Sequence, residues 1–178
     1  MPFGSGQAFG GGASGWKNQL IGGWQWNGIF TAQSGFPLTP EIGFNNSGTG
    51  DTNVTDTPNW NPNFKGPVVL GTVNQWINPQ AFVMPTPGTF GNVSRGSVRG
   101  PGLVDADTSL FKKFSISERF SLQLRAEAFN IFNHSNFFYP NTILFSGNSA
   151  NYSNSSTAGQ ITAAATSRQL QLALKFIF

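Results

Sequence analysis

Four stretches of the chain alternate apolar and polar side chains at every second position, over residues 20–33, 104–114, 120–131 and 169–178. In the third stretch Leu122 and Leu124 share one set of positions, while Gln123 and Arg125 share the other. Successive side chains of a β-strand point to opposite faces of a sheet, so this period predicts four strands, each with one apolar face. The apolar spacing of about 3.6 residues that marks a helix is hard to find.

The connections between these stretches alternate between short and long. Residues 115–119 have the length of a hairpin turn, whereas residues 34–102 and 133–167 are long and rich in Pro, Gly, Asn, Ser and Thr. Short turns at one end of a sheet and long loops at the other are typical of outer-membrane barrels. The sequence therefore predicts an all-β fold: an antiparallel meander of about four strands with two long loops, forming a partial transmembrane β-barrel. A glycine-rich link over residues 10–15 and a strand stub around residues 2–4 precede the first predicted strand.

The register of the predicted hairpin follows from the position of its turn. A turn centred on Ser117 places Phe114 opposite Phe120 and Ser109 opposite Arg125. In this register the two strands keep their apolar side chains on one face and most of their charges on the other.

Charged residues on the polar face admit two interpretations. Asp105 and Asp107 are two positions apart on one strand, and Arg125 and Glu127 are two apart on the next. Paired carboxylates can serve as a general acid and base. The alternative is a ladder of ion pairs on the wall of a barrel lumen, in which Asp107 is diagonal to Arg125. We favour the ladder, and we expect Asp107, Arg125 and Glu127 to be polar residues that face the lumen.

Other chemical signals are isolated. His134 is the only histidine, and no acid or nucleophile lies near it in the sequence. Arg95 and Arg99, among glycines, could touch lipopolysaccharide phosphates, but an ordinary solvated loop is the favoured interpretation. Lys112 falls on an apolar face close to a turn, where a lysine can extend its ammonium to the membrane interface. We therefore expect no enzymatic activity, no cofactor and no metal site.

The amino-acid composition helps to decide whether the apolar faces contact lipid, as in a membrane barrel, or a protein core, as in a soluble sandwich. Only 10% of the residues are charged and 14% are aromatic, and there is no cysteine; an ordinary soluble domain is about one quarter charged. An alternating strand also fits a soluble or surface-exposed β-sandwich that serves as a binding or adhesion module, and this remains the alternative. Uncharged polar faces and aromatic residues near strand ends favour the membrane barrel.

The net charge of +3 is spread along the chain, so we expect no nucleic-acid partner.

The last stretch of the chain is apolar at each alternate position. We interpret it as the final strand of a barrel, which the barrel assembly machinery reads as a signal. The predicted structural assembly signal consists of Leu170, Leu172, Leu174, Phe176 and Phe178.

Several motifs, in order along the chain, resemble the C-terminal barrel region of TonB-dependent receptors, in particular the Oar-like group with large, loop-rich barrels. They are residues 20–39 (LIGGWQWNGIFTAQSGFPLT), 99–102 (RGPG), 107–114 (DTSLFKKF) and 125–134 (RAEAFNIFNH), with 78–82 (NPQAF) and 88–92 (GTFGN) resembling that group's extracellular loop. The similarity runs through nearly all of the chain. Ser135 departs from it, because that group more often has proline there.

The resemblance implies an outer-membrane transporter that imports a scarce nutrient, of the siderophore or glycan class, by energy-coupled uptake. Such receptors have a plug domain and a barrel of about 22 strands. Residues 1–178 would then be the C-terminal part of a barrel, either a gene fragment or a chain with an internal start. The implied partners are outer-membrane lipid, the barrel assembly machinery, the remaining barrel and plug of the parent chain, and the energy-coupling TonB protein, reached through the missing plug.

Overall fold

A computed structural model describes residues 3, 6–12, 14–50 and 55–178. The chain divides into two compact units. The sheet unit comprises Met1–Ala32, Val104–Ser135 and Thr166–Phe178, and the loop unit comprises Gln33–Leu103 and Asn136–Ala165. The sheet unit thus holds the predicted strands, and the loop unit holds the two long connections.

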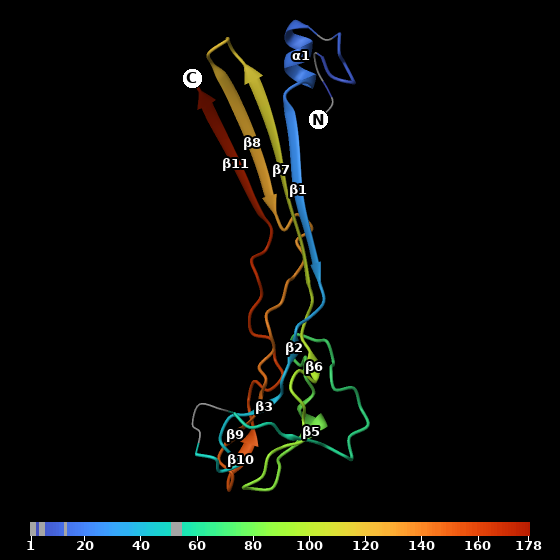
Figure 1. Cartoon of the computed structure of the whole chain (residues 1–178), viewed down its shortest axis with the longest axis vertical. Helices are drawn as coiled ribbons and strands as arrows, with labels where there is room; N and C mark the ends of the chain where they lie inside the picture. Colours follow the sequence, from blue (N-terminus) through green and yellow to red (C-terminus); the bar gives the residue numbers. More distant parts are fainter. Residues whose placement is uncertain (1–2, 4–5, 13, 51–54) are drawn as a thin grey trace. The chain divides into compact units, whose positions relative to one another are not determined.

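The sheet unit is built on an open antiparallel sheet (Figure 1). Its strands, in spatial order, are β1 (Trp24–Gln33), β7 (Leu103–Ser115), β8 (Ser121–Phe129) and β11 (Gln169–Ile177). Spatial order follows chain order, so the predicted all-β meander is confirmed. Within the described residues β1 and β11 are the edge strands and do not pair with each other, so the sheet does not close into a barrel.

The hairpin between β7 and β8 turns one position later than the sequence predicts. Ser115 pairs with Ser121, and Phe111 pairs with Arg125. The predicted centre at Ser117 is wrong because the amides of Ile116 and Ser117 both donate to the carbonyl of Phe120, over 2.9 and 3.0 Å, and close a tight turn around Glu118. The pairing therefore slips by two residues, an even number that leaves every side chain on its predicted face.

The first strand is shorter than predicted, because residues 20–21 belong to a helix, α1 (Gly15–Ile21). The amide of Gly22 donates to the carbonyl of Asn18 over 2.8 Å and ends this helix. Gly23 follows with φ of +71°, and a Cβ there would lie 2.6 Å from the carbonyl oxygen of Lys113. Two glycines thus separate helix from strand, and only β1 keeps the period-two pattern. Of the helices in the described ranges, none is long and apolar enough to cross a membrane.

The predicted strand stub lies at the start of the chain. Residues 2 and 4 of this stub fall outside the described residues. Phe3 forms an isolated parallel bridge with Phe9, and their rings lie 5.5 Å apart.

The long connections contain short elements that the sequence analysis did not predict. β2 (Pro37–Leu38) pairs with β6 (Val98–Arg99), and β4 (Asn59–Trp60) pairs with β5 (Phe82–Val83), which follows a 3₁₀ turn at Pro79–Ala81. β9 (Ile143–Gly147) pairs with β10 (Tyr152–Asn154) and, in parallel, with β3 (Glu41–Ile42). The β3–β9 pair joins the first long connection to the second.

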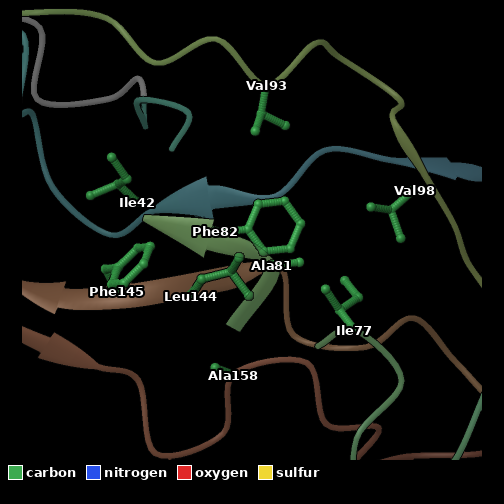
Figure 2. Packing of buried hydrophobic residues seen from close by; sticks show 9 residues of the cluster. All are labelled: Ile42, Ile77, Ala81, Phe82, Val93, Val98, Leu144, Phe145 and Ala158. Carbon is green, nitrogen blue, oxygen red and sulfur yellow. The ribbon is translucent and has the colours of Figure 1, made fainter. Parts of the chain in front are cut away.

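The loop unit has a hydrophobic core of its own (Figure 2). The first long connection supplies most of it, and the second adds the remainder from β9 and the segment after β10. The members are Ile42, Ile77, Ala81, Phe82, Val93, Val98, Leu144, Phe145 and Ala158. Burial of such side chains supplies the free energy that orders loops of this length.

Candidate membrane-facing surface and loop-unit cavity

One face of the sheet carries a continuous set of exposed apolar side chains. The register of β8 with β11 places Leu124 opposite Leu174 and Ala126 opposite Leu172. Leu172 is 83% exposed, and Leu170 and Leu174, next to it on this face, are exposed as well. An exposed apolar surface of this extent marks a site that contacts lipid or another protein.

The predicted assembly-signal residues lie on this exposed face or at its end. Leu170, Leu172, Leu174 and Phe176 alternate along β11, and Phe178 follows the strand. The Phe176 ring lies 5.8 Å from that of Phe120 and 6.3 Å from that of Phe178, so aromatic rings gather at the hairpin end of the sheet. Their role as a signal for the assembly machinery stays a prediction.

The opposite face holds the predicted charged residues, but with different partners. Arg125 pairs with Glu127 of its own strand, over 2.9 Å. The guanidinium of Arg125 also lies 4.8 Å from the centre of the Phe111 ring, because the observed register brings Phe111 opposite it. Asp107 does not join the ladder: its carboxylate accepts from the amide of Asn130 over 3.0 Å. Whether this face lines a lumen stays a prediction.

Asn130 organises the exit from β8, and the sequence analysis did not single it out. It is buried and has φ of +48°, in the left-handed region. Its side-chain amide donates to the carbonyls of His134 and Thr166, over 2.9 and 3.3 Å, and its oxygen accepts from the amide of His134. Its own amide donates to Asp107. A single Asn near the end of a predicted strand is a weak sequence signal for such a role. Only the structure reveals it.

Lys112 lies on the apolar face yet is only 3% exposed. Its ammonium donates to the carbonyl of Gly22 and lies 5.2 and 5.1 Å from the ring centres of Trp24 and Phe114. The expected extension to the membrane interface is therefore replaced by a bond to the backbone and two cation–π contacts. Sequence alone could not place Gly22, at the end of α1, and Trp24, at the start of β1, beside Lys112, because both lie far from it in the chain.

The loop unit contains a polar cavity of about 630 Å³. Glu41, Asp56, Phe90 and Arg95 are among the residues that line it. The sequence alone singles out Arg95 among these residues, because it stands among glycines, and gives no signal for the other three. Arg99, its predicted companion, instead donates to the carbonyl of Gly35 over 3.0 Å.

Among the described residues, no group of three or more His, Cys, Asp or Glu side chains lies close enough together to hold a metal ion.

Comparison with protein-family models identifies the family of this chain. Residues 1–171 match the model of an outer membrane beta barrel domain. Searches of the curated proteins and of the solved structures find no match to this chain. The family match covers nearly the whole chain and accounts for an open sheet with an exposed apolar face. The chain therefore belongs to the outer membrane beta barrel domain family, and its location is the outer membrane.

Proposed function

We propose that this barrel segment belongs to a TonB-dependent receptor of the Oar-like group and takes part in energy-coupled uptake of a nutrient of the siderophore or glycan class. The observation that carries the proposal is the distribution of connections. A five-residue turn, residues 116–120, joins β7 to β8, whereas the segments that lead into β7 and out of β8 fold as a separate unit. Short turns and long extracellular loops are the layout of outer-membrane barrels in general, and the resemblance of the sequence to the Oar-like group narrows the proposal to these receptors.

Three of the motifs that resemble this group fall wholly or partly on strands of the sheet. Residues 107–114 lie within β7, and residues 125–134 span β8 and its exit at Asn130. Residues 20–39 run from the end of α1 through β1 to β2. The resemblance thus extends over the strand wall and over the loop unit, which holds residues 78–82, 88–92 and 99–102, and we propose a transport role, not an enzymatic one.

The open sheet requires further strands. Bacterial barrels contain at least about 8 strands, and this sheet has four with β1 and β11 at its edges. We propose that the parent receptor supplies the remaining strands and the plug, that outer-membrane lipid covers the apolar face, and that the assembly machinery inserts the barrel. The energy-coupling TonB protein would act through the plug.

The soluble or surface-exposed β-sandwich remains a second candidate, but the structure offers it little support. A sandwich covers its apolar face with a second sheet. Leu172 is 83% exposed, and the buried core of the described residues lies in the loop unit. An adhesion module of this kind would have to bury the apolar row of β11 against another protein.

Crosslinking in whole cells tests the proposed uptake role. The full-length receptor that carries this chain is tagged, cells are treated with formaldehyde, and the purified receptor is probed for the energy-coupling protein. We expect the energy-coupling protein to be captured with the receptor. We also expect that deleting the gene of either protein abolishes growth on the same carbon or iron source. Failure to capture it, in cells where a known TonB-dependent receptor does capture it, would refute the proposal.

A further inference from the structure

The polar cavity of the loop unit has the size of a ligand-binding site. Its volume of about 630 Å³ lies within the range of about 300–1,000 Å³ that small-molecule sites occupy. Three segments of the first long connection form it: residues 39–41, 55–57 and 90–95. All three belong to the loop unit, so the cavity is a property of that unit alone.

One wall of the cavity is held rigidly against its neighbour. The amide of Asn92 donates to the side-chain oxygen of Asn59 over 2.8 Å, and the amide of Trp60 donates to the side-chain oxygen of Asn92 over 2.9 Å. Val93 adds a bond from its amide to the carbonyl of Pro58 over 3.1 Å. A Cβ at Gly91 would overlap the carbonyl oxygens of Thr57 and Pro58, so only glycine allows this approach. The wall is therefore preformed, which lowers the entropic cost of binding.

A second wall carries two carboxylates with different surroundings. Asp56 is buried, and its two oxygens accept from the amide and the hydroxyl of Ser47, over 2.6 and 3.1 Å. Its carbonyl accepts from the amide of Ile42 over 2.7 Å, so Asp56 holds the two segments together. Glu41 is half-buried, and its carboxylate makes no ion pair within the described part of the chain. Glu41 thus remains available to accept hydrogen bonds from a ligand.

Phe90 and Arg95 complete the lining with a ring and a cation. The Phe90 ring is 69% exposed although it borders a polar cavity. The exposed guanidinium of Arg95 makes no ion pair among the described residues and offers donors in a planar fork. Three threonines, at residues 39, 55 and 57, also line the cavity.

These groups fit one class of ligand. A sugar ring presents an apolar C–H face that packs on an aromatic ring, and hydroxyls that bond to carboxylate and guanidinium. Glu41 and Asp56 outnumber Arg95, so the lining carries a net negative charge and disfavours anionic ligands, including anionic ferric siderophores. We propose that this cavity is a binding subsite for a neutral oligosaccharide, with Phe90 as its platform and with Glu41 and Arg95 as its hydrogen-bonding pair. The inference rests on the proposed uptake function for its biological role.

Binding to the full-length receptor in detergent tests the subsite. The probes are four neutral hexasaccharides, the malto-, cello-, xylo- and manno-oligosaccharides, together with hexagalacturonic acid as the anionic counterpart. We expect at least one neutral probe to bind in saturation-transfer NMR and titration calorimetry, and the anionic probe to bind more weakly. Phe90→Ala and Arg95→Gln should each lower the affinity about tenfold. Phe138→Ala and Lys65→Gln, at exposed loop-unit positions outside the cavity lining, serve as matched controls and should leave it unchanged.

Three outcomes would overturn the inference: no neutral probe binds, the anionic probe binds more tightly, or the cavity variants bind as the wild type does. These outcomes are separate from those of the crosslinking experiment. Binding that depends on Phe90 without capture of the energy-coupling protein would refute the uptake role and keep the subsite. Capture with unaltered binding in the Phe90→Ala variant would refute the subsite and keep the uptake role.

Discussion

At the scale of single residues, neighbouring positions of β11 meet opposite surroundings. Leu172 lies on the apolar face, where it pairs with Ala126 and is 83% exposed. Gln171 lies on the other face, where it pairs with Glu127. In a membrane-embedded barrel the first position contacts lipid, and the second contacts the lumen.

This difference predicts opposite effects of the same substitution. Leu172→Arg should destabilise the assembled barrel by about 2–4 kcal/mol, because arginine near the bilayer midplane meets no water. Gln171→Arg should be tolerated, because the new guanidinium faces the carboxylate of Glu127. Denaturant titration of the receptor in lipid vesicles measures both. Equal stability of the two variants would contradict the assignment of lipid to the apolar face.

Asn130 allows a second test at the scale of single residues, because its backbone conformation and its side-chain hydrogen bonds contribute separately to the free energy of unfolding. Asn130→Gly keeps the left-handed backbone but removes three side-chain hydrogen bonds, and we expect it to lower the free energy of unfolding by about 2–4 kcal/mol. Asn130→Ala should cost about 1 kcal/mol more, since a Cβ disfavours positive φ. Thermal unfolding of the two variants measures the difference. Equal stability of the Asn130→Ala and Asn130→Gly variants would show that the left-handed backbone at this position does not contribute to the difference in the free energy of unfolding.

At the scale of elements, the junction of α1 with β1 depends on Gly23. Its positive φ and its approach to the carbonyl of Lys113 leave no room for a side chain. Gly23→Ala should therefore destabilise the sheet unit by at least about 1 kcal/mol and displace β1 from β7. Gly12→Ala is the matched control, because a Cβ there meets no atom within 4 Å. Hydrogen exchange of the β1 amides reports on the pairing, and unchanged protection in the Gly23 variant would show that the junction tolerates a side chain.

The strands were predictable from sequence because their alternation is local. β7, β8 and β11 lie within one or two residues of the predicted bounds. The register of the hairpin was not predictable, since it depends on which amides in a five-residue turn reach the Phe120 carbonyl. The helix α1 is too short for its period to be recognised, and residues 20–21 continue the alternation of β1 by coincidence.

At the scale of the whole molecule, the sheet unit and the loop unit obtain their stability from different sources. The sheet exposes its apolar side chains, whereas the loop unit buries its own core. Sequence did not predict this core, because its members are brought together from distant positions by strands of two residues, such as β3 and β5. Pairs this short leave no period-two pattern. The candidate cavity was missed for the same reason: Glu41 and Phe90 are almost 50 residues apart in the sequence.

Two separate sources of stability predict that the loop unit can be loosened without loss of the barrel wall. Leu144 is fully buried in the loop-unit core, at 0% exposure, whereas its neighbour Ile143 on β9 is 37% exposed. Leu144→Ala should destabilise the loop unit by about 2–5 kcal/mol through the lost transfer free energy and the cavity left behind, and Ile143→Ala should cost much less. Limited proteolysis on intact cells should then cleave the loop unit of the Leu144 variant faster than that of the Ile143 variant. The heat-dependent gel mobility of the barrel should remain unchanged in both, because the sheet does not share this core. Loss of that mobility shift in the Leu144 variant would mean that the barrel wall depends on the loop-unit core, and the two units would have to be treated as one.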